Sequence, residues 1–171
     1  TLHPEFAFLP RKFKIAVCGS EQDRAAIHAH DIGIELVKRD GQVGYRVLVG
    51  GGLGRTPVIG VEVCDYLDKQ HLLTYLEAIL RVYNQHGRRD NKYKARIKIL
   101  VKAMGIDAFR EAVEHEWAAM KDGPATLTEA EIERAKSFFS EPEYAVINGA
   151  DAQAALDAQC QQDAIFGNWV K

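Results

Sequence analysis

Apolar residues recur along this chain at two periods, every second residue in the first part and every third or fourth residue later. The first period is typical of strands, and runs rich in β-forming residues cover 12–18, 32–38, 43–49 and 58–63. Residues 39–42, with the sequence Arg-Asp-Gly-Gln, separate the second run from the third and are a turn signal. We therefore predict four strands, of which the second and third form a hairpin.

The helical period begins at about residue 69 and continues toward the end of the chain. Apolar stripes and composition predict helices over residues 72–83, 93–104, 107–117, 128 to 138 or 139, and 152–165. Gly105 is placed to end the second helix, Asp107 to cap the third, and Thr128 with Glu131 to form a capping box for the fourth. Because strands come first and helices follow, the predicted fold is α+β, a mixed or antiparallel β-sheet covered by α-helices.

The composition adds an uneven charge distribution to this picture. The chain has 171 residues, of which 47% are hydrophobic, enough for one domain with a proper core. The net charge is only −2, but residues 1–110 hold 18 basic and 12 acidic residues and carry +6, whereas residues 111–171 hold 4 basic and 12 acidic residues and carry −8. A site for an anionic ligand is therefore expected in the first part, and solvated helix in the acidic part.

Two lysines share one face of the first predicted strand. Because side chains alternate along a strand, Lys12 and Lys14 lie on one face with small residues after them, and Arg11 and three apolar residues take the other face. Neighbouring ammonium groups repel each other unless water or an anion lies between them. This segment alone leaves two interpretations open, a solvated surface strand and an anion site.

Glycines follow the third β run directly. Four of five consecutive positions are glycine, namely Gly50, Gly51, Gly52 and Gly54, and the donors Arg55 and Thr56 come next. A backbone without side chains can approach a ligand closely, and its N–H groups can form an anion-binding concavity. The spacing fits neither the dinucleotide fingerprint nor the phosphate loop. A tightly turned loop and an anion cradle remain as interpretations.

A basic segment follows the first predicted helix. Seven of the 22 Lys and Arg residues fall between residues 88 and 102, where only Asp90 is acidic. On the predicted helix, cations flank both edges of the Tyr93 stripe: Arg89, Lys92 and Arg96 on one edge, Lys94 and Lys98 on the other, with Asn91 near the start. A solvated basic face and nucleic-acid binding are rival interpretations. Nucleic acid is not the expected partner, because the pI is 6.3 and no base-reading aromatic platform accompanies the cluster.

The cysteines and the hydropathy argue against other classes. Cys18, Cys64 and Cys160 form no Cys-x-x-Cys or Cys/His grouping, so no metal site is predicted within this chain. Scattered thiols are typical of a reducing cytoplasm, and neither a signal peptide nor a membrane-spanning run is evident. We therefore expect a cytoplasmic protein without a membrane partner. Because Thr1 is not a natural initiator, we also expect a piece of a longer protein.

Three segments, in order, resemble the sirohaem-dependent sulfite and nitrite reductase haemoproteins. They are Leu-Pro-Arg-Lys-Phe-Lys at 9–14, Val-Gly-Gly-Gly-Leu-Gly at 49–54, and Arg-x-Asn-Lys-x-x-Ala-Arg-x-Lys at 89–98. The resemblance implies an α+β fold of the reductase type, in which sirohaem lies between two related halves. It further implies that residues 8–145 are the sirohaem-binding domain of the first half, and that 146–171 are a helical linker toward a missing second half.

The same resemblance implies roles for individual residues. Lys12 and Lys14 match substrate-side lysines, which would hold an oxyanion and deliver protons. Sirohaem is a polycarboxylate, and contacts with it are implied for the glycines and the basic residues of the three segments. These cofactor-binding candidates are Arg11, Gly50, Gly51, Gly52, Gly54, Arg55, Arg89, Asn91, Lys92, Arg96 and Lys98.

The family reduces sulfite to sulfide, or nitrite to ammonia, at sirohaem coupled to a [4Fe–4S] cluster, with electrons from ferredoxin or an NADPH-dependent flavoprotein. Its cluster-binding cysteine pattern and further substrate arginines are absent from this sequence. We therefore expect part of an assimilatory sulfite reductase, inactive alone and isolated without cofactor, with nitrite the less favoured substrate. The alternative is a non-catalytic domain whose basic helix binds nucleic acid or another polyanion.

Overall fold

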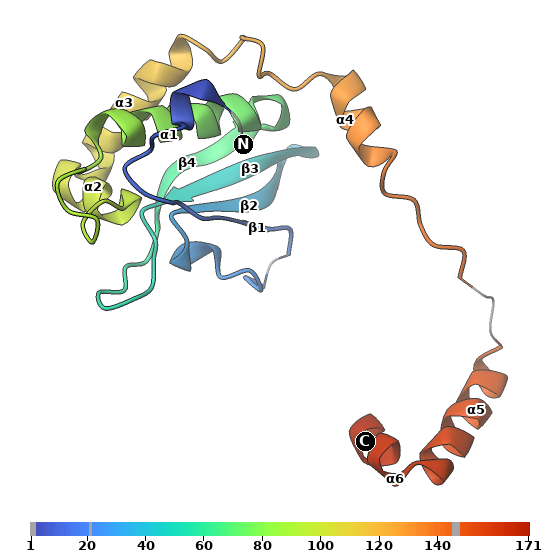
Figure 1. The fold of residues 1–171 in the computed structure, drawn as a ribbon. Coiled ribbons are helices and arrows are strands. Elements are labelled where there is room, and N and C mark those ends of the chain that lie inside the picture. The colour runs from blue at the N-terminus through green and yellow to red at the C-terminus, as the bar shows by residue number, and fades with distance from the viewer. Residues whose placement is uncertain (1–2, 21, 145–147) are drawn as a thin grey trace. The chain divides into compact units, whose positions relative to one another are not determined.

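The computed structural model describes residues 3–20, 22–144 and 148–171, and the chain divides into two units, Thr1–Ile132 and Glu133–Lys171. The first unit holds a four-stranded sheet with helices packed on one face (Figure 1). The mixed sheet and its helices confirm the predicted α+β class. The predicted domain boundary at residues 145–146 lies outside the described residues, so that division stays a prediction.

The sheet has the order β1-β2-β3-β4, with the strands Ile15–Cys18, Ile32–Arg39, Gln42–Val49 and Val61–Asp68. β1 runs parallel to β2, and the other neighbours are antiparallel. The predicted hairpin between the second and third strands is confirmed, and its two turn residues, Asp40 and Gly41, have φ values of 51° and 82°. Positive φ at both positions is type I′ geometry, which matches the twist of the paired strands.

Two strands begin later than the sequence pattern predicts. β1 starts at Ile15 rather than at residue 12, because the Lys14 N–H donates to the Asp31 carboxylate at 3.0 Å instead of to a neighbouring strand. β4 starts at Val61, because Val58 exchanges two backbone hydrogen bonds of 2.9 Å with Gly52 in an isolated bridge. Both differences arise from contacts between distant parts of the sequence, which a local pattern does not contain.

Helices follow the sheet along the chain, as predicted. The α-helices are α1 Leu72–His86, α2 Ile97–Met104, α3 Ile106–Ala118, α4 Glu129–Lys136, α5 Gly149–Gln162 and α6 Ala164–Val170. Short 3₁₀ turns are η1 Pro4–Phe6, η2 Ile27–Ala29 and η3 Lys69–His71. The capping box of α4 is confirmed, since the Glu131 N–H donates to Thr128 Oγ1 at 3.2 Å and the Thr128 N–H to Glu131 Oε2 at 3.0 Å.

The predicted boundaries of α2, α3 and α4 are wrong. α2 begins at Ile97 rather than at residue 93, because the Tyr93 N–H donates to Asn91 Oδ1 at 2.9 Å in a turn and Arg96 is extended, with φ −126° and ψ 151°. The cations at 89–96 are therefore not spread along a helix. α3 is preceded by Gly105 at φ 82° rather than capped by Asp107, which lies in its first turn. α4 ends at residue 136, before the predicted 138 or 139.

The main core lies between the sheet and helices α1, α2 and α3. Its fully buried side chains come from both layers, including Ile32, Ile34, Val47, Val49, Tyr75, Ile79, Tyr83, Ile97, Phe109 and Val113. A smaller cluster on the other face holds Cys18, Ile27 and Leu48. The strand register places Ile15, Val17, Leu36 and Val43 on the helix side, yet they stay 39–55% exposed. The helices therefore leave part of this apolar face open.

The second unit consists of helical segments with their own caps. Asn148 Oδ1 accepts the Ala150 N–H at 3.1 Å at the start of α5, and Asp163 Oδ1 accepts the Ile165 and Phe166 N–H groups at the start of α6. The helix predicted over 152–165 is thus interrupted at Asp163. Neither of these two helices buries a residue in its described part. Within the described ranges, every helix is too short or too polar to cross a membrane.

Candidate anion-binding site

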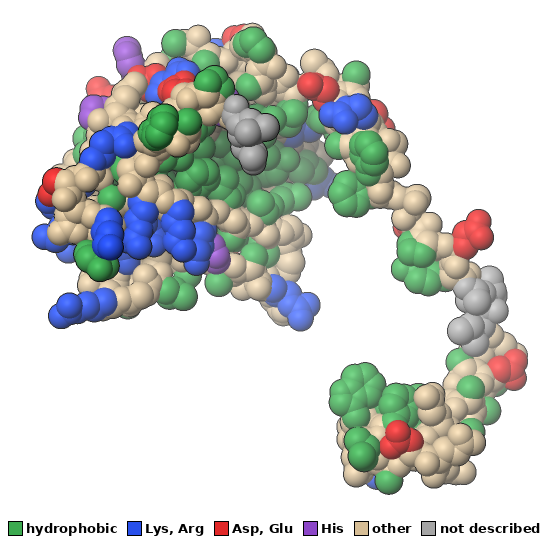
Figure 2. All heavy atoms as spheres, in the orientation of Figure 1, with side chains coloured by type: hydrophobic (Ala, Val, Ile, Leu, Met, Phe, Trp, Pro, Cys, Tyr) green, Lys and Arg blue, Asp and Glu red, His purple; other side chains and the backbone are tan. Residues whose placement is uncertain are grey.

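A cavity of about 550 Å³ lies beside the start of α2. Its lining residues are Arg11, Leu53, Arg55, Thr56, Tyr93, Lys94, Arg96, Lys98 and Ile99. Five of these nine side chains are cationic, and among the described residues no acidic one lines the cavity. Figure 2 shows Lys and Arg side chains gathered on the side of the first unit where α2 lies. We call this space the cationic cavity, and it is suited to a ligand with several negative charges.

Three segments that are distant in sequence build the cationic cavity: the chain before β1, the loop after β3, and residues 93–99. The Tyr83 hydroxyl of α1 lies 3.0 Å from the Arg11 carbonyl and 2.8 Å from the Ala95 carbonyl, so it joins the first segment to the third. Burial raises the pKa of Tyr83, which keeps this hydroxyl protonated as a donor. Arg11 Nη1 adds a bond to the Lys92 carbonyl at 2.7 Å.

The loop at residues 50–57, which we call the glycine loop, depends on close backbone approach. A Cβ on Gly51 would stand 2.5 Å from the His30 carbonyl oxygen and closer still to that of His28, a distance that no side chain tolerates. Gly50, at φ 79°, donates to the Asp31 carbonyl at 2.9 Å. Glycine is therefore required at position 51 by the packing of the loop against η2 and His30, and at position 50 by the positive φ.

Lys98 ties α2 to the glycine loop. Its Nζ donates to the Thr56 carbonyl at 2.6 Å and lies 3.3 Å from the Leu53 carbonyl, and the residue is only 9% exposed. A Cβ on Gly52 would meet Lys98 Cδ at 3.2 Å, so the absent side chain leaves room for the lysine stem. Lys98 thus brings a positive charge to the cavity wall and holds the loop in place.

A second cavity, of about 280 Å³, adjoins the first, since Leu53 and Arg96 line both. Lys14, Ala29, His30 and Gly54 complete its lining. Arg96 is held there by the fully buried Asp31, through Nε–Oδ1 and Nη2–Oδ2 contacts of 2.9 and 2.7 Å. This bidentate pair fixes the plane of the guanidinium, and the Arg96 side chain, which lines both cavities, stays 18% exposed.

The structure brings together some of the residues singled out from the sequence. The cationic cavity is lined by Arg11, Arg55, Arg96 and Lys98, and the second cavity by Lys14 and Gly54. Gly50, Gly51 and Gly52 belong to the glycine loop and allow its close packing, but they are not among the residues that line the two cavities. Lys12, Arg89, Asn91 and Lys92 line neither cavity within the described chain. The functional roles of all these residues stay predictions.

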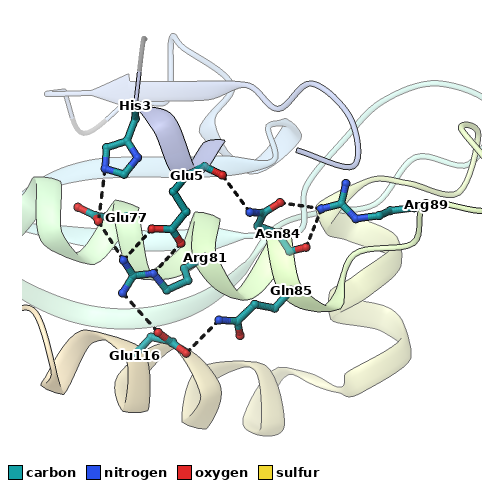
Figure 3. A network of polar contacts seen from close by, with 8 residues as sticks. All are labelled: His3, Glu5, Glu77, Arg81, Asn84, Gln85, Arg89 and Glu116. Carbon is teal, nitrogen blue, oxygen red and sulfur yellow. Dashed lines mark hydrogen bonds and ion pairs between the residues drawn. The ribbon is translucent and has the colours of Figure 1, made fainter. Parts of the chain in front are cut away.

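Arg89 takes part in a different arrangement, shown in Figure 3. Its guanidinium donates to the backbone and side-chain oxygens of Asn84 at 2.9 and 2.7 Å (Figure 3). It also donates to the Phe8 carbonyl at 2.8 Å. In the same network Arg81 holds Glu5 through bonds of 2.7 and 2.8 Å, which lowers the pKa of Glu5. The network fastens the N-terminal segment to α1, so the contacts of Arg89 hold residues 5–8 in position.

The side chains of Asn91 and Lys92 are engaged locally. Asn91 forms the turn that precedes α2, and Lys92 Nζ lies 5.3 Å from the centre of the Tyr93 ring. Tyr93, expected from the stripe to pack inside, is 74% exposed and lines the cationic cavity. The boundary of α2 explains this difference, because a residue outside the helix does not follow the helical stripe.

Sequence reasoning missed several residues of the site. Lys94 was counted in the basic segment but not as a ligand, and Asp31 and His30 were not considered. Asp31 belongs to no motif, and only its distance to Arg96 reveals it. Among the described residues, no group of three or more His, Cys, Asp or Glu side chains is placed to hold a metal ion.

Comparison with known proteins identifies the family of this chain. Residues 1–121 match the family described as the nitrite and sulphite reductase 4Fe-4S domain. The chain belongs to this family. It is 30% identical to sulfite reductase [ferredoxin] 1 of Mycolicibacterium paratuberculosis, over 91% of this chain and 29% of that protein. It is 34% identical to a ferredoxin–nitrite reductase of Leptolyngbya laminosa, over 67% of this chain and 22% of that protein.

Further relatives of the nitrite and sulphite reductase family agree with this assignment. The haemoprotein beta-component of an NADPH sulfite reductase from Acidithiobacillus ferrooxidans is 36% identical, over 63% of this chain and 20% of that protein. A solved structure, the NirA protein of Mycobacterium tuberculosis, superposes with a TM-score of 0.62 at 33% identity, over 72% of this chain and 23% of NirA. The reductase-type fold is thereby confirmed. The chain spans less than a third of the length of each of these relatives.

Proposed function

We propose that this chain is the part of a sulfite reductase haemoprotein that grips the carboxylates of sirohaem in the first half of the enzyme. The observation that supports this best is the cationic cavity, where five Lys and Arg side chains meet and none of the described acidic residues enters the lining. Cations gathered against one space repel one another, so an anionic ligand is the simplest partner for them.

The residues present fit a polycarboxylate. Arg11, Arg55 and Arg96 offer planar donors for bidentate carboxylate contacts, and Lys94 and Lys98 offer point charges. The glycine loop supplies wall without side chains, so backbone can approach a flat ligand closely. A space of about 550 Å³ falls within the range of ordinary ligand pockets. When bound, sirohaem would supply the iron centre for the six-electron reduction of sulfite, with nitrite as the less favoured substrate.

Lys12 and Lys14 are the proposed substrate-side residues. Lys14 lines the second cavity, beside Arg96, and Lys12 is exposed two residues earlier in the chain. A lysine held near an oxyanion stabilises its charge and can donate a proton as oxygen leaves. The Lys14 main chain is fixed by two bonds, its N–H to Asp31 and its carbonyl to the Ile32 N–H at 3.1 Å.

Other parts of the parent protein would complete the reaction. We propose that the cluster ligands, the second half and the docking site for ferredoxin or an NADPH-dependent flavoprotein lie outside this chain, which would be inactive alone. Residues 8–145 would form the sirohaem-binding domain and 146–171 the link to the second half, in a cytoplasmic enzyme. The open apolar face at Ile15, Val17 and Leu36 is a surface on which the second half could pack.

A sirohaem titration of the isolated chain tests this proposal. Absorbance near the haem bands should change and saturate, with affinity that falls as salt rises. The double variant R55Q/K94Q removes two exposed cations of the cavity and should weaken binding about tenfold or more. The matched control K38Q/K102Q removes two exposed lysines that line neither cavity in the described chain and should bind like wild type.

Two outcomes would reject the proposal. Equal affinity in R55Q/K94Q and in the control would show that the cavity is not the binding site. Salt-sensitive binding to an unrelated DNA duplex, with no spectral change on adding sirohaem, would instead support the alternative of a nucleic-acid-binding domain. In the full-length parent, K14M should lose sulfite reduction while the sirohaem spectrum is retained, and normal turnover would remove Lys14 from the proposed substrate site.

A further inference from the structure

Asp31 stands at the junction of the segments that build both cavities. It is fully buried, and the sequence places it in no motif. Its carboxylate accepts both contacts from Arg96 and the N–H of Lys14, at 2.7 to 3.0 Å. Its carbonyl accepts the N–H of Gly50, the first residue of the glycine loop, at 2.9 Å. One residue therefore touches the strand segment, the glycine loop and the entry to α2.

We propose that Asp31 is a positioning residue that holds Arg96, the Lys14 main chain and the start of the glycine loop in one fixed arrangement for an anionic ligand. This inference rests on the proposed function of the cationic cavity and adds a residue to it. Arg96 has five N–H donors, of which the carboxylate engages two, so others stay available to a ligand. Asp31 thus orients Arg96 and leaves N–H donors of the guanidinium available to a ligand.

Electrostatics and positioning predict opposite effects of removing this carboxylate. Asp31 is an anion directly behind a cavity that should bind anions, so its charge alone disfavours the ligand. If Asp31 affected binding only through the repulsion between its charge and the ligand, the variant Asp31→Asn would bind a polycarboxylate more tightly than wild type. If Asp31 acts by holding Arg96 in place, the same change frees the guanidinium to rotate and binding weakens, because preorganised donors lose less on binding.

A purely structural role is a third possibility. Breaking a buried ion pair destabilises a fold, and a partly unfolded sample would also bind less ligand. Arg96 remains 18% exposed and can reach water, so the Asn variant does not leave a cation stranded in the core. Circular dichroism and urea unfolding give the folded fraction, and affinities are then compared per folded molecule.

The probe is uroporphyrin, a polycarboxylate tetrapyrrole without iron, and its fluorescence on titration with the 171-residue chain gives the Kd. We expect D31N to raise the Kd about tenfold or more, as supporting residues behind a binding group commonly do. The matched control is D65N, which makes the same charge change at an exposed carboxylate paired with Arg39 and should leave the Kd unchanged. A D31N Kd equal to or below that of wild type overturns the proposal.

Two further measurements keep the proposal testable. If D31N does not fold, D31E decides, because it keeps the negative charge but its longer side chain shifts the carboxylate away from the position that fixes Arg96; weaker binding supports the proposal and equal binding overturns it. If wild type itself fails to bind uroporphyrin, the proposed function fails. Asp31 is then judged by the exchange rate of the Arg96 Nε–H in nuclear magnetic resonance, which D31N should accelerate; an unchanged rate contradicts positioning.

Discussion

Replacing Lys98 by methionine should loosen the glycine loop and destabilise the first unit. Methionine keeps the length and apolar stem that pack near Gly52, but it removes the ammonium that bonds the Thr56 and Leu53 carbonyls. The perturbation is therefore the loss of one short charge-assisted hydrogen bond of 2.6 Å and one long contact of 3.3 Å, with little change in packing.

The magnitude follows from these distances and from burial. A hydrogen bond to a charged group contributes about 1.5–3 kcal/mol, and the contact at 3.3 Å adds little. Lys98 is 9% exposed, so solvent screens the bond weakly, whereas the two carbonyls can be rehydrated at the cavity wall. We expect the free energy of unfolding to fall by about 2 kcal/mol. For a chain of this size, that corresponds to a melting temperature lower by about 4–8 °C.

Urea unfolding of wild type, K98M and K102M measures this effect. Lys102 lies one turn later on α2 and is exposed, so the same substitution there should change stability by less than about 0.5 kcal/mol. Hydrogen exchange adds a local readout, since the Gly52 and Val58 amides, which pair across the loop, should exchange faster in K98M. A K98M stability within 0.5 kcal/mol of wild type, with unchanged exchange, would refute the view that Lys98 anchors the loop.

Further predictions concern the packing around the site and the N-terminal clamp. G51A should destabilise by more than about 2 kcal/mol, because its Cβ would overlap two backbone carbonyls, whereas G19A meets only Leu36 at 3.8 Å and should be tolerated; thermal melts distinguish them. Y83F should cost about 1–2 kcal/mol in urea unfolding, because it removes the hydroxyl that joins Arg11 to Ala95, and the exposed Y93F serves as control. The pKa of Glu5 is lowered from 4.5 by its bond to Arg81, so this pair stabilises the fold above about pH 4.5 and loses its effect as pH falls through the lowered value. E5Q should therefore be less stable than wild type at pH 7 and converge with it in acid; a constant difference across pH would contradict the assignment.

The elements that the sequence predicted well are those determined by local patterns. The β2–β3 hairpin follows from alternation around a turn at Asp40 and Gly41, and the capping box of α4 from a four-residue motif. The α+β class follows from strands preceding helices. Each of these signals lies within a few neighbouring residues, where side-chain period and backbone preference decide the structure.

The elements that were predicted wrongly depend on contacts across the fold. Residues 93–96 have helix-compatible periodicity, but Asn91 forms a turn and the Tyr83 hydroxyl bonds the Ala95 carbonyl, which stops the helix from starting there. The late start of β1 has the same kind of cause, since Asp31 takes the Lys14 N–H. Long-range partners override local propensity at these points, and they cluster around the candidate site.

The candidate site itself was predicted in part. Motifs pointed to Arg11, Arg55, Arg96 and Lys98, which do line one cavity, but spacing could not show that Lys98 also anchors the glycine loop or that Arg96 is held by a carboxylate. Arg89 was singled out with them, but its hydrogen bonds fasten the N-terminal segment to α1 instead. A basic residue in a motif can serve the fold or the ligand, and the distances to its partners distinguish the two.

The most direct test of the anion-binding claim is to map where a polycarboxylate tetrapyrrole contacts the chain. Titration of isotope-labelled protein with uroporphyrin, followed by amide chemical shifts, gives that map residue by residue. We expect the largest shifts at residue 11, in 52–56 and in 93–99, which surround the cationic cavity. Shifts confined to the β2–β3 turn or to α5 and α6, or no shifts at all, would contradict it.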